Sequence, residues 1–197
     1  MNFDLKTLAL SAATADRSDL LIVLVPDGFR PGNDALSALA AHALKSGDWD
    51  TKAGKSLALY QLPSVAARRV VLVGAGNGSA RSVRQALLGS AAAFKAPQVK
   101  KAAVVFAGAV QPDAVAAAVQ AVAEASYVYT ATKSKPESRA LARVTIGVPD
   151  AAAAKPAFAR GVALVAGVEF AREWANRPAN HATPTLLANA AKSLGKL

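Results

Sequence analysis

Short apolar runs alternate with helix-length segments along most of this chain, and that alternation constrains the fold more than any other feature. Nearly continuous runs of Val, Leu and Ile are typical of strands that are buried on both faces of a sheet. Strands that are joined by helices pair in parallel. Strong runs occur at 20–25, 69–74, 101–108 and 142–149, and weaker runs occur at 3–10 and 56–62. The sequence therefore predicts an α/β fold with a mixed, largely parallel sheet and helices on both faces.

The segments between these runs carry helix start signals. Capping side chains precede apolar stripes after Asn33 or Asp34 and after Ser79 or Ser82. Asp113 is expected to cap a helix that ends near Tyr129. Each of these helices would connect two strands of the sheet.

Two further helices are predicted after the last strand. The first is long, from about 151 to 175, with Pro156 in or near its first turn. The second starts at Thr183 and Pro184 and is expected to end at Gly195. Its apolar stripe consists of Leu186, Leu187, Ala190 and Leu194.

The elements divide the chain into three parts. Residues 1–150 form an N-terminal α/β domain, 151–176 an interdomain helix, and 177–197 the start of an incomplete second domain. An amphipathic helix that opens so close to residue 197 has little after it to pack against. The alternative is that this helix docks back onto the first domain.

Composition excludes several classes of site. The sequence has no Cys, which rules out disulfides and thiolate metal sites. Two histidines, His42 and His181, cannot build a multi-His metal site. We therefore expect no catalytic residue, no metal ligand and no cofactor in this chain. The sequence pattern predicts neither a signal peptide nor a membrane-spanning helix. We therefore expect a cytoplasmic protein without a membrane partner.

Positive charge is concentrated in one third of the chain. The formal net charge is +10, and residues 51–112 contain nine Lys and Arg but no Asp or Glu. Such a segment can attract phosphate or nucleic acid, so a DNA-binding module acting through 51–112 is one hypothesis. A solvated face, or half of an interface with an acidic partner, explains the same charges. The candidate nucleic-acid contacts are Arg68, Arg69, Arg81, Arg84, Lys100 and Lys101.

Two other motifs have ordinary structural interpretations. Residues 74–78, Gly-Ala-Gly-Asn-Gly, follow a strand, but position 79 is Ser79 where a dinucleotide fingerprint needs Gly. A plain strand-to-helix turn is predicted there. Glu169, Arg172 and Glu173 have helical spacing and are predicted to form a surface ion-pair set.

The C-terminal third resembles the leucyl aminopeptidase (cytosol aminopeptidase) family. Residues 161–180 read GVALVAGVEFAREWANRPAN and lead to Pro184, Leu186 and Ala188. They follow the family's helix with an Arg–acid pair, then N-x-P-x-N and P-x-x-L-A. Upstream, 47–59 and the strand 69–74 agree with the order of the bacterial N-terminal domain.

The resemblance implies that the parent is an enzyme and that this chain lacks its catalytic residues. Members are cytoplasmic metalloproteases of the hydrolase class. They remove N-terminal residues from peptides using two divalent metal ions, zinc or manganese, and assemble as hexamers. Their catalytic motifs lie in a C-terminal domain, and none of those motifs occurs in this chain. The resemblance therefore implies a non-catalytic, macro-domain-like N-terminal part, inactive alone, whose partners are its own catalytic domain and further copies. Some bacterial members also bind DNA, which keeps the DNA-binding alternative open.

Overall fold

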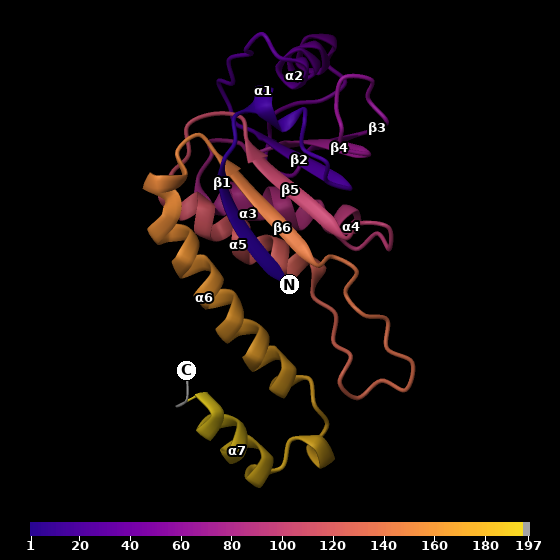
Figure 1. Ribbon diagram of the computed structural model, residues 1–197, viewed down its shortest axis with the longest axis vertical. Helices are drawn as coiled ribbons and strands as arrows, with labels where there is room; N and C mark the ends of the chain where they lie inside the picture. The colour runs from indigo at the N-terminus through magenta and orange to yellow at the C-terminus, as the bar shows by residue number, and fades with distance from the viewer. Residues whose placement is uncertain (195–197) are drawn as a thin grey trace.

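The computed structural model describes residues 1–194, and its centre is one six-stranded sheet (Figure 1). The strand order across the sheet is β1-β6-β5-β2-β4-β3. All neighbouring strands pair in parallel except β3, which runs antiparallel to β4 at one edge. The strands are β1 (Asn2–Thr7), β2 (Leu20–Val25), β3 (Ser56–Tyr60), β4 (Arg69–Gly74), β5 (Lys101–Phe106) and β6 (Arg143–Val148). The predicted mixed, largely parallel sheet is confirmed.

Helices cover both faces of this sheet (Figure 1). Two of them, α1 and α2, pack on one face, and α3, α4, α5 and the first half of α6 pack on the other. The remaining elements, η1 and α7, follow α6 and lie outside this layered body. The ranges are α1 (Leu10–Ala13), α2 (Ala35–Ser46), α3 (Ala80–Gly89), α4 (Ala91–Phe94), α5 (Pro112–Ser126), α6 (Ala151–Ala175), η1 (Ala179–His181) and α7 (Pro184–Leu194).

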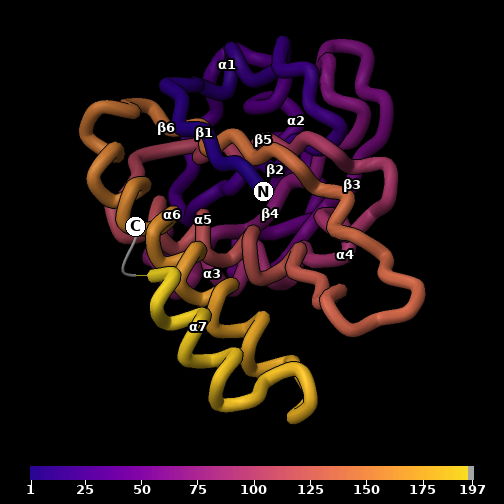
Figure 2. The backbone as a smooth tube through the Cα atoms, turned by 60° about the horizontal axis from the view of Figure 1, so that its bottom comes forward, coloured from indigo at the N-terminus to yellow at the C-terminus, as the bar shows by residue number. Residues whose placement is uncertain are grey.

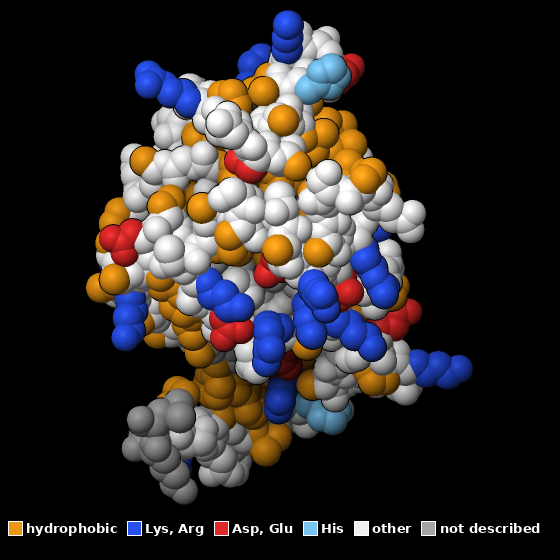
Figure 3. Space-filling view, turned by 45° about the horizontal axis from the view of Figure 1, so that its top comes forward, with side chains coloured by type: hydrophobic (Ala, Val, Ile, Leu, Met, Phe, Trp, Pro, Cys, Tyr) orange, Lys and Arg blue, Asp and Glu red, His pale blue; other side chains and the backbone are white. Residues whose placement is uncertain are grey.

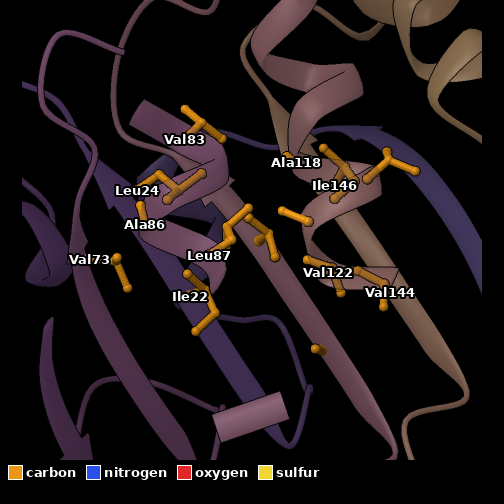
Figure 4. Close-up of a cluster of buried hydrophobic side chains, with 14 of the residues drawn as sticks. Ile22, Leu24, Val73, Val83, Ala86, Leu87, Ala118, Val122, Val144 and Ile146 are labelled. Carbon is orange, nitrogen blue, oxygen red and sulfur yellow. The ribbon is translucent and has the colours of Figure 1, made fainter. Parts of the chain in front are cut away.

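Alternate side chains of each central strand enter two separate hydrophobic cores. In β2, Ile22 and Leu24 join the core beneath α3 and α5, whereas Val23 and Val25 join the core beneath α2. Figure 4 shows the first core, where Leu87 of α3 points toward the strands. Burial on both faces is the reason that these strands read as continuous apolar runs.

The first core also depends on the small side chains of α5. Ala114, Ala118 and Ala121 are buried completely, and they let α5 lie close to the sheet and to its neighbouring helices. Ala has the highest helix propensity, so this close packing does not weaken the helix itself.

The helix starts agree with the predicted caps in three of four cases. The Asp34 carboxylate accepts a hydrogen bond from the backbone N–H of Ser37, and the Ser79 hydroxyl accepts one from the N–H of Ser82. The Thr183 hydroxyl accepts from the N–H of Leu186 at the start of α7. The predicted end of that helix, Gly195, lies outside the described residues.

The predicted cap at Asp113 is wrong. The cap position of α5 is Gln111, Pro112 occupies the first turn, and the helix ends at Ser126. The Asp113 carboxylate instead forms an ion pair with the Arg160 guanidinium of α6. The local sequence pattern assigns this side chain to helix capping. In the structure it pairs with an arginine of another helix, and the sequence alone does not reveal that partner.

Two other boundaries differ from the prediction. The first strand ends at Thr7, Leu8 and Ala9 form a short connection, and Leu10 starts the short helix α1. The strand predicted at 56–62 ends at Tyr60, because Gln61 takes a left-handed conformation with φ of 51°. Pro156 lies inside α6 beyond its first turn, where its ring faces solvent.

The long helix α6 packs on the α/β body mainly through its first half. Ala154, Ala157 and Gly161 are its buried residues, and Gly161 meets the backbone of Ala116 in α5. Val162 and Val165 also pack against the first core. Further along, α6 extends past the sheet, and the chain turns back through η1 into α7 (Figures 1 and 2). None of the described residues of α7 is buried. This helix therefore does not dock into either core of the first domain.

By length and composition, α6 could cross a membrane, and it is the one helix among residues 1–194 that could. A single helix of this kind is weak evidence for a span. Its first half already packs on α5 and β1 within the α/β body. The absence of a membrane partner stays a prediction.

Candidate functional site

Four of the six basic candidates share one edge of the sheet. Arg68 and Arg69 lie at the start of β4, and Lys100 and Lys101 lie at the start of β5. Because these strands are parallel neighbours of β2, their amino ends meet at one edge, which we call the basic edge. The basic edge brings together residues that are about thirty positions apart in the sequence.

The basic edge is held by an acid that the charge pattern did not predict. The Asp19 carboxylate at the start of β2 accepts hydrogen bonds from the backbone N–H groups of Lys100 and Lys101, at 3.0 and 2.9 Å. These bonds fix the entry to β5 and leave both lysine side chains exposed. Asp19 also places one negative charge among the four positive charges.

An exposed aromatic ring completes the basic edge. The Arg69 guanidinium lies over the Tyr60 ring at 4.8 Å from its centroid, and 62% of Tyr60 is exposed. Both residues line an open pocket of about 470 Å³ together with Arg68, Gln61 and Gln98. Tyr60 is not among the contacts predicted from sequence, because one or two aromatics in the basic segment are weak evidence for base stacking; its place at the end of an edge strand beside a base is the signal that favours it.

The other two basic candidates lie elsewhere. Arg81 and Arg84 belong to α3, which begins after the carboxyl end of β4. The Arg84 guanidinium forms an ion pair with Glu124 of α5, with 2.7 Å between Nη2 and Oε2. The six residues therefore do not form one patch. Figure 3 likewise shows basic side chains with acidic side chains among them on the face it presents.

The glycine-rich turn after β4 is filled by this chain's own backbone. The N–H of Gly76 donates to the carbonyl of Thr51, and the N–H of Asp27 donates to the carbonyl of Gly76. A Cβ on Gly74 would lie 2.3 Å from the carbonyl oxygen of Lys52. Segment 51–55 thus takes the space where a ligand would approach the glycines. This geometry agrees with the predicted plain turn.

The residues present do not fit a pair of divalent metal ions. Such ions need clustered carboxylate or imidazole ligands. Across residues 1–194 no three His, Cys, Asp or Glu side chains come together as a possible metal site. His42 is exposed on α2, and His181 is exposed in η1.

The acidic and basic residues of α6 do not pair with each other, so the predicted ion-pair set is wrong. Glu169 binds the guanidinium of Arg139, with 2.5 Å between Oε1 and Nη2. Glu173 accepts a hydrogen bond from the Tyr127 hydroxyl at 2.8 Å. The Arg172 guanidinium lies over the Tyr127 ring at 4.7 Å from its centroid. The partners come from the segment that follows α5, which helix spacing alone does not reveal.

This Tyr127 cluster gives α6 a second attachment to the body. Arg139 also donates from Nε to the carbonyl of Ser126, at the end of α5. Burial raises the pKa of the Tyr127 hydroxyl, and its hydrogen bond to Glu173 adds to that shift. The phenol is therefore held protonated as a donor, and the cluster fixes the direction in which α6 leaves the sheet.

Apart from this cluster, α6 and α7 present apolar side chains to solvent. Leu164 is 46% and Val168 is 51% exposed on α6. Leu186, Leu187 and Leu194 are exposed on α7. Figure 3 shows hydrophobic side chains along the narrow part of the molecule that connects the α/β body to its C-terminal end. Contiguous exposed apolar side chains are typical of a surface that packs against another domain or protein.

Comparison with known proteins places these features in a family. Residues 26–136 match the N-terminal domain of the cytosol aminopeptidase family. The whole chain is 67% identical to 38% of a probable cytosol aminopeptidase of Verminephrobacter eiseniae (strain EF01-2). It is 63% identical to 40% of another from Acidovorax ebreus (strain TPSY). The chain thus spans about two fifths of the length of these relatives.

Solved structures agree on the fold. A mutant of tomato leucine aminopeptidase matches the whole chain over 42% of its own length, with a TM-score of 0.76 and 23% identity. The bottromycin maturation enzyme BotP, in complex with Mn, matches 91% of the chain over 36% of its length, with a TM-score of 0.68 and 21% identity. The chain therefore belongs to the cytosol aminopeptidase family and contains that family's N-terminal domain.

Proposed function

We propose that this chain is the non-catalytic N-terminal part of a metal-dependent leucyl aminopeptidase, a cytoplasmic enzyme that removes N-terminal residues from peptides. The observation that carries the proposal is the match of the full chain to only two fifths of proteins described as probable cytosol aminopeptidases. The remaining three fifths of the parent would supply the catalytic domain. Two divalent ions, zinc or manganese, would be bound there and not by the residues of this chain.

The exposed faces of α6 and α7 are the surface on which that catalytic domain would pack. The Leu164 side chain of α6 is 46% exposed, and no described residue of α7 is buried. Burying such leucine side chains stabilises an interface by roughly 1.5–3 kcal/mol each. The two attachments of α6, at Gly161 and in the Tyr127 cluster, would set the angle between the two domains. The hexamer expected for the parent would then depend on surfaces outside this chain.

The chain alone is expected to show no peptidase activity. Hydrolysis at a two-metal centre needs ligands that activate water and polarise the carbonyl, and residues 1–194 bring no such group together. The assay is release of leucine from a leucyl peptide with added Mn²⁺ or Zn²⁺, with the longer parent as the positive control. Release by the 197-residue chain that disappears with EDTA would contradict the proposal.

A second candidate function is DNA binding through the basic edge. The observation that favours it is that Arg68, Arg69, Lys100 and Lys101 gather at one edge of the sheet beside the exposed Tyr60 ring. Basic side chains there could contact phosphates, and an exposed ring could stack on a base. Arg81 and Arg84 are not part of this surface, so they are weaker candidates for contacts.

Replacing Lys100 and Lys101 by Gln is expected to weaken DNA binding equally for all sequences. It should also lower the slope of log affinity against log salt by about 1 for each phosphate that is no longer neutralised. The matched control is Lys45→Gln with Lys155→Gln, which removes the same charge from exposed positions on α2 and α6. Gel retardation across a salt series measures both. Equal losses in the two pairs would show that net charge acts, and not the basic edge.

A further inference from the structure

A pocket of about 310 Å³ lies between α3, α5 and α6, apart from both the basic edge and the glycine-rich turn. Its apolar lining comes from Ala123 of α5 and from Val165 and Val168 of α6. Its polar lining consists of two arginines, two glutamates and one glutamine. A concavity of this size that combines an apolar part with convergent polar groups can accommodate a small molecule.

The pocket contains a cation without a charged partner. Among residues 1–194, the Arg172 guanidinium makes no ion pair and no side-chain hydrogen bond, and it rests on the Tyr127 ring. The acids nearest in sequence, Glu169 and Glu173, bind Arg139 and Tyr127 instead. Its donors are therefore open to an anionic group, and a planar guanidinium suits a carboxylate.

The pocket also offers acceptors for a cation. Glu124 uses Oε2 for its ion pair with Arg84, and Glu169 uses Oε1 for its ion pair with Arg139. Within the described part of the chain, the second carboxylate oxygen of each residue takes no hydrogen bond. Both glutamates line the same pocket as Arg172.

We propose that this pocket binds a free aliphatic α-amino acid in its zwitterionic form. The α-carboxylate would pair with Arg172, the α-ammonium would donate to the open oxygens of Glu124 and Glu169, and the side chain would contact Val165 and Val168. Only the source of the ligand rests on the proposed function, because an aminopeptidase releases free amino acids as products. Binding itself needs no metal and no hydrolysis, so it fails or succeeds independently of the peptidase activity.

The test uses the 197-residue chain with EDTA present, which removes any contribution from a metal centre. The chain carries both cores whole, since their buried residues all precede Phe158. Titration with L-leucine, followed by NMR shifts of the amides of α3, α5 and α6, is expected to saturate with a dissociation constant of about 1 mM. N-acetyl-leucine lacks the ammonium group and leucinamide lacks the carboxylate. Each is expected to bind at least about tenfold more weakly, because one charged group of the pocket is then left without its partner.

Variants then assign the individual interactions. Arg172→Gln should weaken leucine binding about tenfold and leave the leucinamide affinity nearly unchanged, whereas Glu124→Gln should affect leucine and spare N-acetyl-leucine. The matched control is Arg81→Gln, which removes an exposed arginine from α3 outside the pocket and should leave the leucine affinity unchanged.

Equal binding of leucine and its two blocked analogues would overturn the proposal, as would shifts that do not saturate. The same titration on the longer parent must also give metal-independent shifts in α5 and α6. Their absence there would show that the pocket is covered in the parent and would equally overturn the proposal.

Discussion

Gly161→Ala is expected to weaken the packing of α6 on α5 and to lower the free energy of unfolding by about 1–3 kcal/mol. An added Cβ would lie 3.0 Å from Ala116 Cα, 3.2 Å from the Ala116 carbonyl oxygen and 3.2 Å from Val119 Cβ. Two of these neighbours are backbone atoms of a buried helix, so they cannot move aside cheaply. Gly161→Val should have a larger effect, because its γ carbons also need space. Urea denaturation followed by circular dichroism measures both.

Gly167 of the same helix provides the matched control. An added Cβ there has no neighbour within 4 Å, so Gly167→Ala is expected to be neutral or to stabilise by up to about 1 kcal/mol through helix propensity. Opposite signs for one and the same substitution at the two glycines would establish that α6 packs closely on α5 at Gly161 and faces open space at Gly167. Equal effects at both positions would contradict the close packing of α6 on α5 at Gly161.

Gly74→Ala is expected to destabilise the fold by about 3 kcal/mol or more, because the added methyl group would overlap backbone atoms. Its Cβ would lie 2.3 Å from the Lys52 carbonyl oxygen and 2.6 Å from the Thr51 carbonyl carbon. The segment 51–55 would have to leave the end of β4. That movement would break the hydrogen bonds of Gly54 and Gly76 with this region. Thermal unfolding of the purified variant is the measurement.

Gly89→Ala controls for the loss of unfolded-chain entropy that any Gly→Ala substitution brings. The Cβ at Gly89 would meet Gly54 at 3.6 Å, which is an ordinary contact, so little change is expected. If Gly74→Ala proved as harmless as Gly89→Ala, segment 51–55 would not occupy the glycine-rich turn. The turn would then be open to a ligand and would not be a plain strand-to-helix connection.

The sheet was predictable from sequence because its strands are buried on both faces. Ile22 and Val23 must both be apolar, since one faces α3 and the other faces the α2 core, and that requirement leaves a visible run in the sequence. Edge strands have no such requirement. The limits of β1 and β3 were accordingly less well predicted than those of β2 and β4.

The polar contacts of the candidate sites were less predictable. Asp113 pairs with Arg160, and Arg84 pairs with Glu124 across two helices. Glu169 binds Arg139 and not the arginine on its own helix. In each case the partner is chosen by how helices pack in space, whereas sequence patterns report only neighbours within one element. The same limitation applies to the charge-rich third of the chain, which folding divides between two ends of the sheet.

The two exposed surfaces, the apolar faces of α6 and α7 and the basic edge, differ in chemistry and suit different partners. The exposed side chains of α6 and α7 are mainly apolar and suit a permanent partner, the catalytic domain of the proposed parent. The basic edge is polar and charged, and it suits an anionic partner that binds and dissociates. They lie on different parts of the molecule, so the proposed enzyme role and the DNA-binding alternative can hold together.

The most direct test is the intact mass of the protein made from its own gene in the source cell, combined with peptide mapping beyond Leu197. We predict a chain about two and a half times as long as these 197 residues, since they align with 38–41% of the relatives. Its later part should contain clustered Asp, Glu and Lys residues that bind two metal ions. A native protein that ends at Leu197 would contradict the proposed parent enzyme. It would leave α6 and α7 without their proposed partner and make the basic edge the leading evidence for function.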